Sequence, residues 1–286
     1  MPISRDHLLA LQIPEVSQQY TAKDCMLYAL SLGYSADPMD RQQLRFTYET
    51  GLQAVPTMGV VLAHPGYWPR LLDSGLDWVR IVHAEQGLIL HKRLPAQADV
   101  IGISRVVDVI DKGPGKGALV SYERRILDRL TREPLCTISQ TFLARGDGGF
   151  GGPTGPVASP PNIPERSPDL VCELPTALHM ALLYRLNGDF NPLHADPDVA
   201  QKAGFDRPIL HGLATWGVAG LAVLKTALNF EADLVASIFG RFSAPVFPGD
   251  TLRTDMWLEP GAVAFRTWAV ERSIMVINNG RVELRG

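Results

Sequence analysis

Asp189 and His194 stand five positions apart in the segment Tyr184–Pro197, on an irregular turn that the sequence predicts after a helix. Gly188 ends the apolar pattern that precedes the turn, and the residue before Pro192 avoids helical backbone. A carboxylate and an imidazole on one turn can share a water molecule, which one group deprotonates while the other orients it. Gly-Asp and Asn-Pro are also ordinary turn chemistry, so a purely structural role for both residues stays open.

A second candidate is Gly212, which stands directly before the apolar run Leu213–Leu228. This run is apolar nearly all round, which predicts a helix buried on every side. The first N–H groups of a helix have no intrahelical partner, and the helix dipole adds partial positive charge there. Such a donor, fixed in a dry place, suits an oxyanion. The alternative is that the glycine only permits a tight turn.

The two candidates belong to one longer pattern. Residues 184–194 read Tyr-Arg-Leu-Asn-Gly-Asp-Phe-Asn-Pro-Leu-His, and residues 210–213 read Leu-His-Gly-Leu. Together they closely resemble the hydratase 2 motif of MaoC-like enoyl-CoA hydratases, above all the double-hotdog module of peroxisomal multifunctional enzymes. The resemblance extends over nearly the whole chain. Asn187 departs from the serine usual in this motif, and we expect the exchange to matter little because both are small polar turn residues.

This resemblance implies a lyase that hydrates trans-2-enoyl-CoA to (R)-3-hydroxyacyl-CoA in fatty-acid β-oxidation. Asp189 and His194 would then hold and activate the water, and the Gly212 N–H would stabilise the thioester oxygen. We expect no metal and no cofactor, because coenzyme A is part of the substrate. The first half of the chain lacks such a pair, so we expect it to shape an acyl pocket that admits more than short chains.

Further positions match residues that contact the acyl-CoA in the family. Asn191 lies within the motif, and His83 with Ala84 matches a His-Gly pair, so Ala84 is a departure that would add a methyl group near the ligand. Lys112 matches a lysine that meets the CoA phosphates, and Phe242 matches an aromatic residue near the CoA. Without the resemblance, Lys112 would be a turn lysine and Phe242 a core residue. The resemblance favours binding for Lys112 and leaves Phe242 open.

The composition is that of an ordinary globular protein and argues against several classes. Of 286 residues, 46% are hydrophobic and 20% charged, and the net charge of −3 gives no basic field for nucleic acid. Cys25, Cys136 and Cys172 are far apart and odd in number, which argues against a disulfide framework. The histidines show no metal-binding spacing, and no apolar run reaches the roughly 20 residues of a membrane span.

The chain ends favour a free-standing cytoplasmic protein. No signal-peptide core follows Met1, and the terminal Glu-Leu-Arg-Gly is not a Ser-Lys-Leu peroxisomal address. A reducing compartment also fits the scattered cysteines. The family resemblance adds an acyl-CoA thioester as partner, with neither nucleic acid nor membrane, and a homodimer as the expected assembly.

The candidate site residues must be positioned by predicted helices and strands, which follow one another in a similar order in the two halves of the chain. Each run predicts a helix and several strands, an α+β pattern in which an antiparallel sheet wraps a helix. The Gly/Pro-rich segment 146–168 is predicted as a linker between a degenerate hotdog unit, 1–145, and a catalytic hotdog unit, 169–286. The expected fold is therefore a double hotdog with two sheets. Tyr28–Gly33 repeats Tyr184–Gly188 weakly, without an acid/base pair after it.

Local periodicity predicts the individual elements near the site. A helix is expected from Thr21 or Asp24 to Leu32, and a second helix over Thr176–Leu186. The stretch Gly87–His91 is expected to be a strand.

Two other functions are compatible with a hotdog protein. An acyl-CoA thioesterase would direct water to the thioester carbonyl and release a free thiol. A non-catalytic acyl-CoA-binding protein would bind the ligand without turnover. The Asn-Pro-Leu-His context does not indicate the first, and the joint presence of Asp189, His194 and Gly212 argues against the second.

Overall fold

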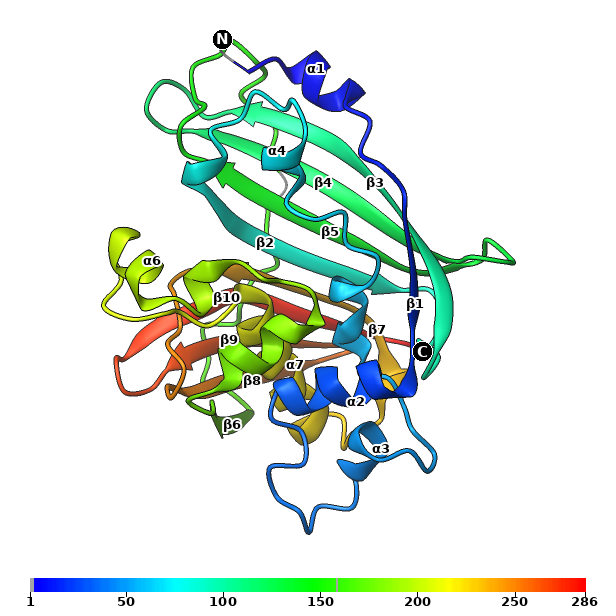
Figure 1. The fold of residues 1–286 in the computed structure, drawn as a ribbon. Coiled ribbons are helices and arrows are strands. Elements are labelled where there is room, and N and C mark those ends of the chain that lie inside the picture. Colours follow the sequence, from blue (N-terminus) through cyan, green and yellow to red (C-terminus); the bar gives the residue numbers. More distant parts are fainter. Residues whose placement is uncertain (1–2, 158) are drawn as a thin grey trace.

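The chain forms one antiparallel sheet of ten strands, with helices packed against it (Figure 1). This computed structural model describes residues 3–157 and 159–286, so residues 1 and 2 of the predicted first unit and residue 158 of the predicted linker lie outside it. The first half contains α1 (Arg5–Ala10), β1 (Val16–Tyr20), α2 (Ala22–Ser31), α3 (Leu44–Thr47), η1 (Pro56–Val61), α4 (Trp68–Leu71), η2 (Trp78–Arg80), β2 (Ile81–Leu90), β3 (Ala98–Asp111), β4 (Ala118–Asp128) and β5 (Pro134–Ala144).

The second half follows a similar plan and confirms the α+β prediction. It contains β6 (Leu170–Pro175), α5 (Met180–Tyr184), η3 (Arg185–Asn187), η4 (Pro192–His194), α6 (Pro197–Lys202), α7 (Gly212–Thr226), η5 (Ala232–Leu234), β7 (Val235–Phe242), β8 (Thr251–Glu259), β9 (Ala262–Ala269) and β10 (Ile274–Leu284).

The two expected sheets are joined into one at the seam between β2 and β7. The strand order is β1-β3-β4-β5-β2-β7-β10-β9-β8-β6, so the two halves are arranged symmetrically about this seam. The paired residues run from Glu85 opposite Arg241 to Ile89 opposite Ser237, and Glu85 forms a salt bridge with Arg241 at 3.1 Å. Pairing the two strand edges satisfies backbone groups that would otherwise be open to aggregation.

The second half wraps its sheet around one long apolar helix, as predicted. Helix α7 packs against β6, β7, β8 and β9, and every side chain from Ala214 to Leu224 is buried. A helix that is apolar all round is stable only inside a core, which explains its central place in this half. Its first residue, Gly212, therefore has a fixed position.

The first half was also expected to wrap its sheet around a helix, and the helical element there is shorter than α7. Helix α2 has the predicted start, with a capping box formed by Thr21 and Asp24, but it packs mainly against α3 and α5. The six-residue η1 covers β2 and β5 instead. A Cβ atom at Gly59 would lie 3.0 Å from Cys136 Sγ, so the glycine lets this thin element approach the sheet closely.

The glycine-rich segment that follows β5 is attached to the turn between β3 and β4. Asp111 accepts hydrogen bonds from the Gly149 N–H at 2.7 Å and the Gly151 N–H at 2.9 Å, and its own N–H donates to Pro153 O. These backbone donors lower the pKa of the Asp111 carboxyl. The division of the chain at 146–168 stays a prediction.

Two element boundaries differ from their predictions. The predicted helix over Thr176–Leu186 is shorter and begins at Met180, because the Thr176 N–H and hydroxyl donate hydrogen bonds to Asp250 O instead. Strand β2 begins at Ile81, before the predicted Gly87, since pairing with β5 extends it. In the described ranges, the structure contains no helix long and apolar enough to cross a membrane.

Candidate active site

The predicted turn is organised by Gly188 and Asn191. Gly188 ends η3 with a φ of 114°, a left-handed conformation that glycine adopts without strain. The Asn191 N–H donates to Asp189 Oδ1 at 3.2 Å, and the Asn191 side-chain oxygen accepts from the Leu193 N–H at 3.1 Å. These bonds orient the Asp189 carboxylate while leaving it exposed.

His194 is held at the end of this turn with one ring nitrogen free. The side chain is 8% exposed, and its Nδ1 lies 2.9 Å from Ile209 O. A carbonyl oxygen only accepts, so Nδ1 carries the hydrogen and Nε2 keeps its lone pair. Burial lowers the pKa of His194, although Asp189 opposes the shift. The ring is therefore neutral near pH 7 and can accept a proton at Nε2.

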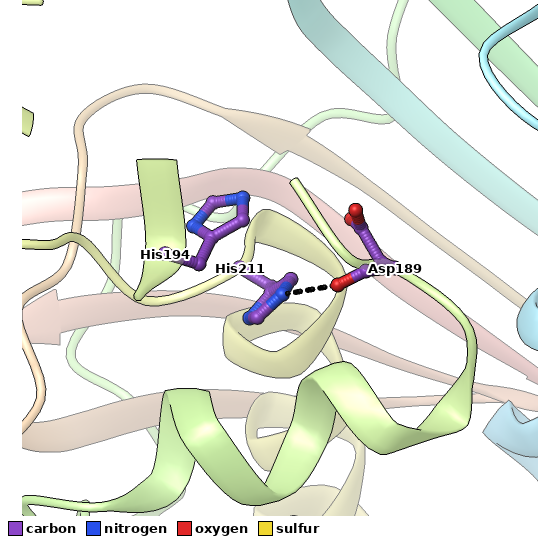
Figure 2. Close-up of side chains that lie close together, drawn as sticks. All are labelled: Asp189, His194 and His211. Carbon is purple, nitrogen blue, oxygen red and sulfur yellow. Dashed lines mark hydrogen bonds between the residues drawn. The ribbon is translucent and has the colours of Figure 1, made fainter. Parts of the chain in front are cut away.

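A second imidazole, His211, lies directly against the pair (Figure 2). Its Nε2 lies 3.2 Å from the backbone oxygen of Asp189, and its ring stacks on His194 with 3.8 Å between the ring centroids. The side chain is 1% exposed, and burial lowers its pKa to about 4. His211 was not among the predicted site residues. Its place between Leu210 and Gly212 in the motif was the available signal.

Asp189, His194 and His211 together raise the question of a metal ion. One ligand-capable atom from each lies within 4.8 Å of the others. The two imidazole planes are only 28° from parallel, so their in-plane lone pairs do not converge over the roughly 2 Å of a metal–nitrogen bond. Nε2 of His211 is also occupied by the Asp189 carbonyl. The arrangement fits a water molecule better than a metal.

Gly212, whose N–H is the predicted backbone donor, lies beside the ring of Phe242. Gly212 is the first residue of α7, where an N–H has no intrahelical partner. A Cβ atom at this position would lie 3.4 Å from Phe242 Cε1, so glycine keeps the space beside the donor free. The Phe242 ring in turn lies 4.7 Å from the His83 ring, measured between centroids. Thus Gly212, Phe242 and His83 lie together in the structure.

His83 brings the first half of the chain to the turn of the second. Its Nε2 donates to Glu85 O at 3.0 Å, and burial lowers its pKa to about 4, while the Asp189 charge opposes this shift. Ala84 lies at an irregularity in the pairing of β2 with β5, between His83 and Glu85. The β2–β7 seam therefore places groups from both halves around one site.

Lys112 is not brought to this cluster. It is exposed in the turn between β3 and β4, three strands from β2 in the sheet. The oxygen of the Asn191 side chain is used within the turn, which leaves only its NH₂ group for a ligand. The binding roles of Asn191, His83, Ala84, Lys112 and Phe242 stay predictions.

Each half of the chain matches the model of a known protein family. Residues 160–279 match the family described as MaoC like domain, and residues 18–146 match the MFE-2 hydratase 2 N-terminal domain. The chain is 37% identical over 297 residues to the peroxisomal enoyl-CoA hydratase 2 of Arabidopsis thaliana, covering 98% of this chain and 95% of that protein. The chain belongs to the MaoC-like hydratase 2 family. This membership confirms the predicted resemblance and makes the protein a hydro-lyase of the MaoC-like type.

Solved structures confirm the fold of this family member. A MaoC-like dehydratase from Phytophthora capsici superposes with a TM-score of 0.86 at 32% identity, covering 98% of each chain. A Mycobacterium tuberculosis protein described as a double hotdog superposes with a TM-score of 0.59 at 17% identity, covering 96% of this chain and 94% of that chain. The second likeness shows the fold alone, which is the predicted double hotdog.

Proposed function

We propose that this hydro-lyase reversibly hydrates trans-2-enoyl-CoA to (R)-3-hydroxyacyl-CoA. One observation carries the proposal: Asp189, His194 and the N-terminus of α7 form one cluster beside His83 and Phe242. The name of the Arabidopsis relative, enoyl-CoA hydratase 2, supports the substrate class.

The chemistry follows from the groups that meet in the cluster. The Asp189 carboxylate and His194 Nε2 hold one water molecule, whose hydroxyl adds to C3 of the enoyl group while a proton is delivered to C2. Negative charge that develops on the thioester oxygen is stabilised by the N–H of Gly212. Asp189 and His194 act as one titrating unit, so the base is not assigned to either residue alone. The step needs no metal and no redox cofactor.

The first half supplies the space for the acyl chain in this proposal. The thin η1 covers its sheet where the second half has the 15-residue α7, and His83 connects this half to the catalytic turn. Enoyl chains longer than crotonyl should therefore be accepted. Strict preference for crotonyl-CoA would contradict this part. Lys112 is proposed to meet the CoA phosphates as a compact, exposed charge.

The test follows the absorbance of trans-2-enoyl-CoA of short, medium and long chain, with chiral analysis of the product and an assay for free thiol. Hydration to the (R)-3-hydroxy product, lost in Asp189→Asn, is the expected result. A free thiol with an unchanged enoyl group would indicate a thioesterase instead. Binding without turnover at every chain length would indicate an acyl-CoA-binding protein.

A homodimer is proposed as the assembly. Leu178, Leu182 and Leu186 follow one another at intervals of four residues and are 79%, 53% and 53% exposed. Large exposed apolar side chains are often found at protein contact surfaces. Sedimentation of wild type and Leu182→Glu would test this surface. The cytoplasmic location stays a prediction, since the Arabidopsis relative is named as peroxisomal.

A further inference from the structure

We propose that His211 is a positioning residue, a neutral imidazole that holds Asp189, His194 and Gly212 in one geometry. This inference rests on the proposed function, because these three groups are the ones that would handle water and the thioester oxygen. His211 itself does not touch the substrate in this proposal.

Three independent contacts support the assignment. The ring of His211 hydrogen-bonds to the backbone of Asp189 at 3.2 Å and stacks on His194 at 3.8 Å (Figure 2). Its own backbone precedes Gly212 and accepts hydrogen bonds from the Thr215 N–H at 3.0 Å and the Thr215 hydroxyl at 3.2 Å. One side chain thus connects the start of α7 to both ends of the catalytic turn.

The hydrogen-bond partners determine which nitrogen of His211 carries the hydrogen. The Asp189 carbonyl can only accept, so Nε2 of His211 must donate. Nδ1 is buried and has no partner within the described residues. A hydrogen on Nδ1 would be a buried donor without an acceptor, which costs about 1–3 kcal/mol. The neutral form with hydrogen on Nε2 is therefore the stable one.

The charged groups around the ring favour the same state. Protonation would place a cation against His194, which faces it from η4, and near Arg185 from η3. Asp189 favours the cation, but its carboxylate is exposed to solvent, which weakens that interaction. Tyr184 from α5 covers another side, with 5.0 Å between the ring centroids.

This arrangement removes His211 as a rival acid or base. Its Nε2 is committed to a backbone oxygen, and its Nδ1 is buried away from solvent. Proton transfer is therefore confined to the Asp189 carboxylate and His194 Nε2. A neutral ring beside His194 also adds no positive charge that would lower the proton affinity of His194 further.

Substitutions of His211 by glutamine and asparagine distinguish a positioning role, which needs the hydrogen bond from Nε2, from a packing role, which needs only the ring. The amide nitrogen of glutamine lies three bonds from Cβ, as Nε2 of histidine does, whereas that of asparagine lies two bonds away. His211→Gln should retain kcat within about tenfold of wild type, while His211→Asn and His211→Phe lose about 100-fold, because the backbone of Asp189 is then released. KM should change little in all three variants. His91→Gln, at an exposed position, serves as the unchanged control.

A packing role predicts the opposite order. Phenylalanine preserves the ring and its stacking, so activity that is higher in His211→Phe than in His211→Gln would overturn the proposal. Thermal melting of each variant shows whether the fold is retained. If every variant unfolds, nitrogen NMR of the wild-type protein still tests whether His211 is a neutral positioning residue.

Nitrogen NMR of ¹⁵N-labelled histidine tests the geometry without any substrate. At pH 7, His211 should show a protonated Nε2 and a bare Nδ1, and His194 should show the reverse. Assignment uses His91→Gln and His194→Gln for comparison. Hydrogen on Nδ1 of His211, or on both of its nitrogens, would overturn the proposal. The spectrum does not depend on turnover, so it distinguishes this inference from failure of the hydratase function.

Discussion

The two halves of the molecule share a helix-and-turn segment, but only the second contains the predicted acid/base pair. Tyr28–Gly33 and Tyr184–Gly188 lie against each other, with 6.0 Å between the Tyr28 and Tyr184 rings. Asn187, the departure from the family motif, donates to Ser31 at 3.0 Å and thereby bridges the two copies. The weak sequence repeat is thus a structural repeat, related across the seam.

The halves diverge immediately after this shared segment. In the second half, Asp189 and His194 follow, and α7 begins with the bare N–H of Gly212. In the first half, η1 begins with Pro56, which has no N–H at all. The first half could not stabilise an oxyanion at the matching place even if it had an acid/base pair. The two halves therefore share a fold and differ in the few residues that are predicted to act in catalysis.

The cores also differ in how they are filled. Helix α7 fills the second half with apolar side chains, whereas the sheet of the first half carries the fully buried Arg124. The Arg124 guanidinium donates to Val60 O at 2.5 Å and the Tyr122 hydroxyl at 3.1 Å, and its Nε has no partner within the described residues. It thus supports the end of the thin η1.

Removing the carboxylate of the Asp189/His194 pair should have the largest effect on kcat. Asp189→Asn should lower kcat by about 10²–10⁴-fold, because the amide cannot accept a proton from water. The matched variant is Asp37→Asn in the first half, where an exposed carboxylate only accepts from the Met39 N–H at 2.9 Å. Enoyl-CoA hydration assays should show no change for it. Equal losses in both variants would mean that the first half is also catalytic.

Acid should destabilise the protein through a buried histidine from each half. Burial holds the pKa of His83 and His211 at about 4, below their ordinary value of 6.5. The unfolded chain therefore binds more protons, and the free energy of unfolding falls as pH drops from 6.5 toward 4. Urea unfolding across pH 4–8 measures this slope.

The histidine variants provide the control for the acid effect. His211→Gln should flatten the dependence of unfolding free energy on pH within this window, and His83→Gln should flatten it further. An unchanged slope in both variants would show that other groups cause the loss of stability.

A methyl group at the start of α7 should reduce catalysis without unfolding the protein. In Gly212→Ala the new Cβ lies 3.4 Å from Phe242, a tolerable contact that occupies the space beside the N–H. We expect kcat to fall about 100-fold, as when one oxyanion donor is lost. Gly220→Ala, deeper in the same helix, meets Thr57 at 3.0 Å and should retain kcat. Similar kcat values for the two variants would argue against a donor at Gly212.

The smallest effect is expected for Arg124→Met in the first half. Removing a buried cation relieves its desolvation, while the Val60 carbonyl loses a hydrogen bond, which costs about 1–3 kcal/mol. We expect the free energy of unfolding to rise by about 1 kcal/mol, measured in urea. The exposed neighbour Arg125→Met is the control. A clear loss of stability would show that the guanidinium is needed to hold η1 in place.

The sequence alone predicted the helices, strands and turns that depend on residues close together in the chain. The capping box at Thr21 and Asp24, the buried helix from Gly212 and most strand positions follow from backbone preference and periodicity. The motif around Asp189 and His194 likewise contains its own turn signals. These features depend on neighbours along the chain, so the sequence alone was sufficient for them.

Only the tertiary structure revealed the features that depend on contacts between segments far apart in the chain. The sequence gives no sign that β2 and β7 join two sheets into one, since strand edges pair by their exposed backbone and not by side-chain identity. The replacement of a central helix by η1 depends on close approach at Gly59. The role of His211 required the Asp189 carbonyl to lie 3.2 Å from its ring, a contact between residues 22 positions apart. Contacts of this kind are set by packing, which local patterns do not encode.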